Sequence, residues 1–212
     1  MTAAATVVAT RHQLQGIAES FVAGPQYRAT GTIRLAVRQD GFSATTLAIA
    51  VHGTTLTWPG GSTALAGPVS AVAQASGLDI GPPAGVYESV AALSPDTILH
   101  LDADAADAIY RSLYAGGFAI NAVLPEGHPV LWPEHFDVAA TADEVNYGVS
   151  AGDEFHELPY AYVGPWDFAT SPRTGPLWNA PFGAVHSLDV TADIDTLAAD
   201  VTAFFRRVEE KL

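Results

Sequence analysis

The sequence predicts an α+β fold, in which antiparallel sheet packs against about four helices and the last helix is amphipathic. Four segments space their apolar residues at helical intervals, and seven short segments have the composition of strands. Strands and helices follow one another in blocks, which favours antiparallel pairing over alternating βαβ units.

Two helices are predicted in the N-terminal half of the chain. The first covers about residues 10–22, and Gly24-Pro25 should end it. The second begins at Pro68, a residue suited to the first turn of a helix, and ends at Gly77.

Two further helices are predicted in the C-terminal half. One covers about residues 103–115 and should end at Gly116-Gly117. The other covers about residues 192–211 and has the clearest apolar stripe. It carries acidic residues in its first turn and basic residues in its last turns, as the helix dipole favours.

Strands are predicted between these helices. Asp40-Gly41 is a hairpin signature and Gly53 marks a second reversal, so the first three strands should form an antiparallel meander. The last three should form a second meander before the C-terminal helix. The predicted strands cover residues 32–39, 43–51, 54–58, 97–101, 135–141, 145–150 and 159–164.

Length and composition limit the class of protein. With 212 residues, 49% of them hydrophobic, the chain can bury one sizeable core, so we expect a single domain over residues 1–212. A weak organisation in two halves, 1–95 and 96–212, is the alternative, because each half has a hairpin and a helix after it. The lack of cysteine excludes disulfides, thiolate metal sites and cysteine nucleophiles.

The charge balance excludes other classes. Nine basic residues against 23 acidic residues give a formal net charge of −14, so we expect neither nucleic acid nor a membrane as partner. No basic residue precedes Arg11, which is unlike a signal peptide and predicts a cytoplasmic protein. There is no phosphate loop or dinucleotide fingerprint, and we expect no cofactor.

Four histidines and one aspartate in the C-terminal half are candidate metal ligands. Their spacing matches no metal-binding motif, so no metal is expected, although assembly from scattered positions stays open. These residues are His128, His135, Asp137, His156 and His186.

The segment 128–186 is the richest in polar and aromatic residues. His135 and Asp137 should share the strand face opposite Phe136, and they could converge with Asn146 if their strands pair. An imidazole beside a carboxylate can act as a general base, so His135 and Asp137 are the candidate catalytic pair. The alternative is a structural pair that pins the loop before the strand.

Aromatic and polar side chains around this pair are candidates for substrate binding, because such residues line small-molecule pockets. Tyr160 and Tyr162 should share one strand face. The alternative is packing in the core or in a dimer interface. The candidates are Trp132, Glu134, Asn146, Tyr147, Tyr162, Trp166, Trp178 and Asn179.

Ser150 lies in a G-x-S-x-G sequence, with Asp153 and His156 close behind. In hydrolases that use this motif the serine stands between a strand and a helix, whereas here another strand should follow. A glycine-flanked turn is therefore the favoured interpretation of the motif.

Several short motifs give the chain a family resemblance. They are Y-R-A-T-G-T-I at residues 27–33, W-P-E-H-F-D at 132–137, N-Y-G at 146–148, Y-V-G-P-W at 162–166 and W-N-A-P-F-G at 178–183. Through them the chain resembles a family of uncharacterised actinobacterial proteins. The resemblance implies a single-domain cytoplasmic bacterial protein and implies no activity.

The leading hypothesis is a small-molecule-binding domain that could be an enzyme, with His135 as base, Asp137 as its orienting partner and tyrosine hydroxyls as donors. The alternative is a non-enzymatic structural protein that forms a homodimer or binds a partner through its aromatic side chains. A serine hydrolase that uses Ser150 is the third hypothesis.

Overall fold

The computed structural model describes residues 3–212, which form two compact units. The first unit extends to Tyr110 and includes Leu131–Phe136, and the second comprises Arg111–Val130 and Asp137–Leu212. Both contain helices and antiparallel strands, which confirms the predicted α+β class. No helix within residues 3–212 is long and apolar enough to span a membrane.

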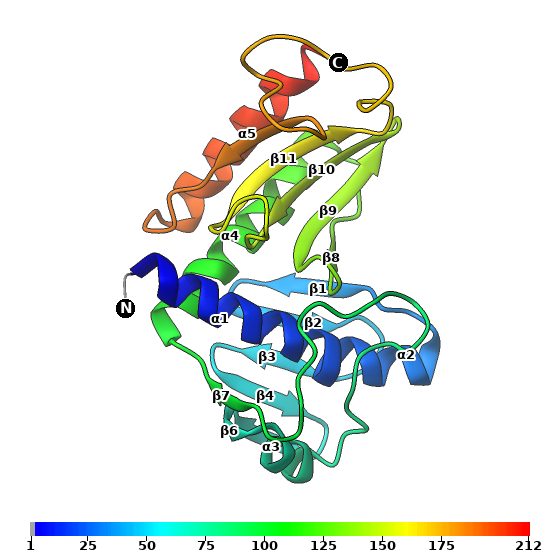
Figure 1. Ribbon diagram of the computed structural model, residues 1–212, viewed down its shortest axis with the longest axis vertical. Coiled ribbons are helices and arrows are strands. Elements are labelled where there is room, and N and C mark those ends of the chain that lie inside the picture. Colours follow the sequence, from blue (N-terminus) through cyan, green and yellow to red (C-terminus); the bar gives the residue numbers. More distant parts are fainter. Residues whose placement is uncertain (1–2) are drawn as a thin grey trace. The chain divides into compact units, whose positions relative to one another are not determined.

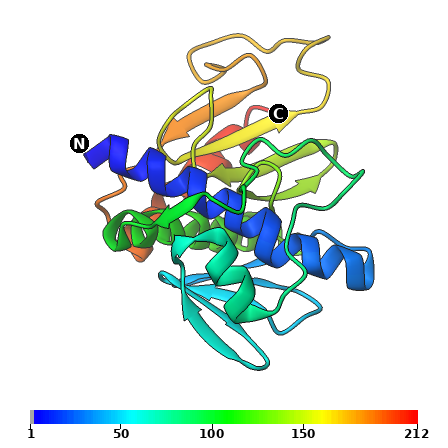
Figure 2. The ribbon, with the colours of Figure 1, turned by 60° about the horizontal axis from the view of Figure 1, so that its bottom comes forward.

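The first unit opens with one long helix in three parts, drawn in blue in Figure 2. These are α1 (Ala3–Ile17), the π-helical η1 (Ala18–Ala23) and α2 (Gly24–Thr30). The prediction that Gly24-Pro25 ends the helix is wrong. The N–H of Gly24 bonds to the carbonyl of Glu19, and the Ser20 carbonyl, which Pro25 cannot bond, accepts from Gly81 N at 2.9 Å. The π register thus accommodates the proline.

The first unit also contains an antiparallel meander, and β8 pairs with β1 at its edge through Leu35 and Leu131. The predicted strand 43–51 is two strands, because the N–H groups of Thr45 and Thr46 bond to Oε1 of Gln26 instead of continuing the ladder. The strands are β1 (Leu35–Arg38), β2 (Gly41–Ala44), β3 (Ala50–His52), β4 (Thr55–Trp58), β5 (Gly61–Ala64) and β8 (Val130–Trp132).

A smaller element completes the first unit. Strands β6 (Ala66–Pro68) and β7 (Ile98–His100) pair, and α3 (Val69–Ser76) follows β6. Helix α3 begins directly after Pro68 and ends at Gly77, which has a φ of 63°. The predicted end of this helix is therefore confirmed, and its start lies one residue after the predicted Pro68, which is still extended and belongs to β6.

The second unit holds four antiparallel strands in the order β9-β10-β11-β12 and two helices (Figure 1). Helix α4 begins in the first unit and its C-terminal part lies in the second. The elements are α4 (Ala103–Val123), β9 (Asp137–Ala142), β10 (Val145–Ser150), β11 (Tyr160–Pro165), β12 (Ala184–Ser187) and α5 (Ile194–Glu209).

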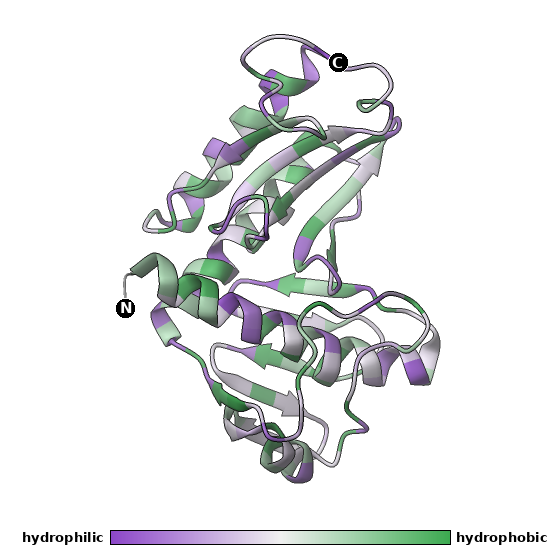
Figure 3. Ribbon diagram, in the orientation of Figure 1, coloured by the Kyte–Doolittle hydropathy of each residue, from purple (hydrophilic) through white to green (hydrophobic). Residues whose placement is uncertain are grey.

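The prediction that α4 ends at Gly116-Gly117 is wrong, because packing decides the role of Gly116. A Cβ atom on Gly116 would lie 2.7 Å from Cβ of Val149 and 2.9 Å from Val138, so the glycine lets the helix approach β9 and β10 closely. The predicted C-terminal helix is confirmed: Asp193 caps α5 by accepting from Thr196 N at 2.8 Å. Figure 3 shows its alternating apolar and polar residues.

The two faces of this sheet differ. Val138, Val149 and Tyr147 face the helices, and the Tyr147 ring meets Phe205 of α5 edge-on with 5.6 Å between ring centroids. Register partners share a face of an antiparallel sheet. Asp137, Ser150, Tyr160 and Ser187 occupy successive partner positions across the four strands, on the opposite face. We call this the polar face.

Candidate functional site

Two tyrosine–aspartate hydrogen bonds organise the polar face. Tyr162 donates its hydroxyl to Asp137, and Tyr160 donates to Oδ2 of Asp153 at 2.6 Å. Gly148 makes the first bond possible, because a Cβ atom there would lie 2.5 Å from the Tyr162 ring. Alternation along β11 therefore correctly predicts that Tyr160 and Tyr162 share a face.

Burial raises the pKa of both tyrosines above the ordinary value of 10.0, and the carboxylates they bind raise it further. Both hydroxyls therefore keep their protons at neutral pH and act as donors. Asp137 itself is buried, with 6% of its surface exposed.

The expected convergence of Asp137 with Asn146 is wrong. Asn146 is the register partner of Thr141, at the other end of the β9–β10 hairpin from Asp137, which faces Ser150. Oδ1 of Asn146 accepts from Thr141 Oγ1 at 2.7 Å and from Trp166 Nε1 at 3.0 Å. Asn146 thus holds the indole of Trp166 in place.

The other predicted catalytic residue, His135, belongs to the first unit and is exposed. Throughout residues 3–212, no side chain or backbone group forms a hydrogen bond or ion pair with its imidazole. Phe136, which follows it, has a φ of 49°, so the extended alternation assumed for residues 135–141 begins only at Asp137. A base–carboxylate role for His135 and Asp137 stays a prediction.

Trp132 and Glu134 also belong to the first unit, where Trp132 lies beneath the guanidinium of Arg34 at 5.8 Å. Gln15 Nε2 donates to the backbone carbonyl of Glu134 at 2.9 Å. Oε2 of the Glu134 side chain is buried and has no hydrogen-bond partner among the described residues.

A buried acidic group that the sequence did not predict lies near Glu134. Glu19, on the π-helical turn, is fully buried, and one of its carboxylate oxygens accepts from the hydroxyl of Ser89. Burial raises the pKa of Glu19, and the charge of Glu134 adds to this effect. Burial also raises the pKa of Tyr87, with contributions from the same two carboxylates.

Ser150 of the G-x-S-x-G sequence and the nearby His156 do not form a nucleophile–base pair. Ser150 is buried, and its Oγ accepts from Gly152 N at 3.1 Å. Strand β11 follows, as predicted, rather than a helix. His156 instead bonds through Nε2 to Oγ of Ser187, at 2.9 Å.

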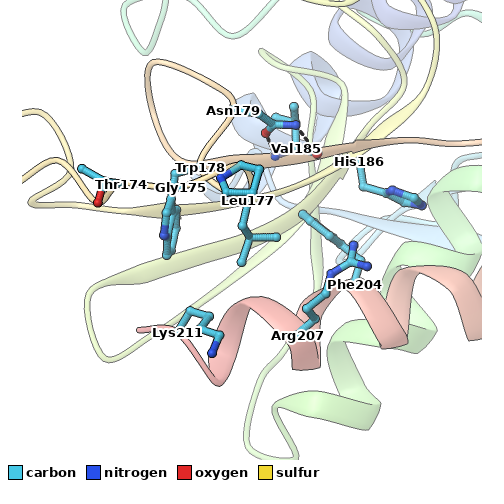
Figure 4. Close-up of a pocket in the computed structure, with 11 residues that line it drawn as sticks. Thr174, Gly175, Leu177, Trp178, Asn179, Val185, His186, Phe204, Arg207 and Lys211 are labelled. Atoms are coloured by element: carbon cyan, nitrogen blue, oxygen red, sulfur yellow. Dashed lines mark hydrogen bonds between the residues drawn. The ribbon is translucent and has the colours of Figure 1, made fainter.

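A groove of about 560 Å³ lies in the second unit, between the loop 174–179, the edge of β12 and α5 (Figure 4). Two residues predicted to bind substrate, Trp178 and Asn179, line it. The lining residues are Thr174, Gly175, Pro176, Leu177, Trp178, Asn179, Val185, His186, Phe204, Arg207 and Lys211.

Trp178 and Asn179 are both held in place. The Trp178 ring packs on Phe168, with 5.6 Å between centroids, and the Arg173 guanidinium lies 5.5 Å from its centre. Asn179 bonds to the N–H and the carbonyl of Val185, at 2.8 and 3.1 Å, and so occupies part of the open edge of β12 as another strand would. The loop is therefore anchored on both sides of its turn.

The charge of the groove is opposite to that of the chain. None of its lining residues is acidic, whereas Arg207 and Lys211 are cationic. Arg207 lies 5.8 Å above the Phe204 ring, and neither cation forms a salt bridge with any described carboxylate. The groove therefore combines an apolar wall with two positive charges, and within residues 3–212 the one carboxylate bonded to a lining side chain is that of Asp200, which contacts His186 at 2.8 Å.

No family model, curated protein or solved structure matches this chain. Among the residues that the structure describes, no group of three or more histidine, aspartate or glutamate side chains could hold a metal ion.

Proposed function

We propose that this protein binds a small amphipathic anion, an apolar molecule that ends in a carboxylate or a similar group, in the groove at Trp178. The observation that carries this proposal is the pairing of an apolar lining with Arg207 and Lys211 in a chain of net charge −14. A volume of about 560 Å³ lies within the range of small-molecule sites.

The position of each group suggests how the ligand lies. Leu177 points toward α5 from the loop, and Phe204 faces it from the helix (Figure 4). Phe204 is already buried, so an apolar chain or ring would displace water mainly from the half-buried side chains of Leu177 and Trp178. This favours binding in proportion to the apolar area buried. The anionic end would then lie at Arg207, in the last turn of α5, and at Lys211, just after the helix.

Calorimetric titration with octanoate and with neutral 1-octanol tests this function. We expect saturable binding of octanoate and weaker binding of the alcohol. Arg207→Ala should weaken octanoate binding about fivefold, the value of one partly exposed ion pair. Arg206→Ala, which removes the same charge from the adjacent position outside the groove, is the matched control. Equal effects of the two substitutions would contradict a specific anion site.

One observation favours the alternative of a homodimer: the large ring of Trp166, which directly follows β11, is 62% exposed. Sedimentation of the wild type and of Trp166→Ala tests it. A dimer that becomes a monomer in the variant would support an aromatic interface, and a monomeric wild type would contradict it.

A further inference from the structure

We propose that Ser187 and His156 form a nucleophile–base pair that can transfer the acyl group of a neutral ester. Oγ of Ser187 lies 2.9 Å from Nε2 of His156, and the other ring nitrogen, Nδ1, lies 2.8 Å from the backbone carbonyl of Leu158. Neither residue lines the groove at Trp178, so this activity goes beyond the proposed function and is tested separately.

The contact between Nδ1 of His156 and the Leu158 carbonyl determines which ring nitrogen carries the proton. A carbonyl oxygen can only accept a hydrogen bond, so Nδ1 carries the proton and Nε2 has the free electron pair. Ser187 must then donate its hydroxyl proton toward Nε2. This is the geometry that a general base needs in order to activate a serine, with the Leu158 carbonyl as the group that orients the ring.

The position of Ser187 on the edge strand gives it access to a substrate. Ser187 is exposed, unlike the buried Ser150. Leu188 N bonds inward to the Pro159 carbonyl, whereas Val185 N bonds outward to Asn179. N–H groups alternate along an antiparallel strand, so the N–H of Ser187 points outward with that of Val185.

The outward N–H provides a site for the developing oxyanion. No acceptor within the described part of the chain bonds to the N–H of Ser187. The amide of the nucleophilic serine is one of the donors that stabilise the tetrahedral intermediate in serine hydrolases. The edge of β12 therefore presents the hydroxyl and one oxyanion donor from the same residue.

Aromatic rings beside the pair indicate the substrate class. The ring of Tyr160 lies 5.5 Å from that of His156, and Phe155, which is 46% exposed, lies 5.1 Å from Phe182. The carboxylate of Asp153 adjoins these rings through Tyr160 and would repel an anion. An uncharged ester with an apolar acyl group fits these surroundings.

The reaction has two steps. Ser187 Oγ attacks the ester carbonyl carbon while Nε2 of His156 takes the hydroxyl proton. The bond from that carbon to the alkoxy oxygen then breaks, and Nε2 returns the proton to this oxygen, which leaves as an alcohol. In the second step water attacks the acyl group and gives a proton to Nε2. The Ser187 oxygen leaves with this proton, and a carboxylic acid is released.

Labelling with an alkyl fluorophosphonate, followed by peptide mass spectrometry, tests the pair, together with hydrolysis of p-nitrophenyl butyrate. We expect the label on Ser187 in the wild type. Ser187→Ala should lose the label and its hydrolysis rate should fall about a hundredfold or more. His156→Gln, which fills similar space but cannot take a proton at neutral pH, should slow both reactions comparably.

Ser70→Ala, at an exposed serine of α3, is the matched control and should behave as the wild type. Unchanged unfolding midpoints in the Ser187 and His156 variants would show that the effects are not caused by unfolding. No label on Ser187, a label on Ser150 instead, or unchanged hydrolysis by Ser187→Ala would overturn the proposal.

Discussion

The hydroxyl of Tyr162 donates a hydrogen bond to the carboxylate of Asp137, across 25 residues of sequence and two strand pairings. Gly148, on the strand between them, leaves the space that the tyrosine ring occupies. Burial and the charge of Asp137 both raise the pKa of Tyr162. The bond thus joins strands β9 and β11 over β10, and it gives the polar face a fixed arrangement of side chains.

Tyr162→Phe should destabilise the protein by about 1–3 kcal/mol, because it removes a hydrogen-bond donor from a buried carboxylate. Urea unfolding followed by far-UV circular dichroism measures this change. Tyr27→Phe, at a hydroxyl that forms no hydrogen bond with any described residue, should change the free energy of unfolding by less than about 0.5 kcal/mol. Similar losses in both variants would contradict the importance of the Tyr162–Asp137 bond.

Stability should fall as the pH rises above about 10. Burial raises the pKa of Tyr87, Tyr110, Tyr147, Tyr160 and Tyr162 above the ordinary 10.0. In the unfolded chain these tyrosines ionise near pH 10, while the folded protein keeps them neutral, so the stability they give is complete below pH 10 and is lost above it. Thermal unfolding midpoints between pH 8 and 11 measure the effect, and a constant midpoint would contradict it.

Gly116→Ala should destabilise the second unit by about 1–3 kcal/mol through overpacking, despite the higher helix propensity of alanine. The added methyl group would meet Val138 and Val149 at 2.7–2.9 Å. Asn121→Ala, at an exposed position of the same helix, should be nearly neutral. Denaturant titration of both variants distinguishes packing from propensity, and a more stable Gly116→Ala would show that the close approach is not required.

Glu19→Gln should raise the thermal unfolding midpoint at pH 7–8, because the amide keeps the shape of the side chain without a buried charge. The pKa of Glu19 is raised above 4.5 in the folded protein, so its contribution to stability is complete below pH 4.5 and is lost as the pH rises. The advantage of the variant should therefore shrink toward pH 4.5. Glu88→Gln, at an exposed position, is the control and should show no such pH dependence.

Local patterns in the sequence predict several elements correctly. The predicted strand 145–150 coincides with β10, and the segment 192–211 contains α5. Both have a periodicity that their own residues determine. The predicted helix ends at Gly24-Pro25 and Gly116-Gly117 are wrong because distant groups decide them. At the first of these, the N–H of Gly81 bonds to the Ser20 carbonyl, which Pro25 cannot bond, so the helix continues. At the second, Gly116 is required because Val149 of the sheet packs against it.

In the candidate site, too, the features set by local patterns are predicted and those set by distant residues are missed. Alternation along β11 places Tyr160 and Tyr162 together, and the composition of the loop before β12 points to Trp178 and Asn179. Ser187 and His156 were not predicted as a pair, since 31 residues separate them and neither lies in a motif for the other. The cations at the groove were also missed, because Arg207 and Lys211 follow the pattern of a helix C-terminus.

The most direct test of ligand binding is a titration of the isotope-labelled protein with octanoate, followed through its indole N–H signals by NMR. The chain has four tryptophans, and loss of one signal in Trp178→Phe identifies that of Trp178. We predict a saturable shift of the Trp178 signal, with the signals of Trp58, Trp132 and Trp166 unchanged. An unchanged Trp178 signal at saturating octanoate would contradict the proposed site.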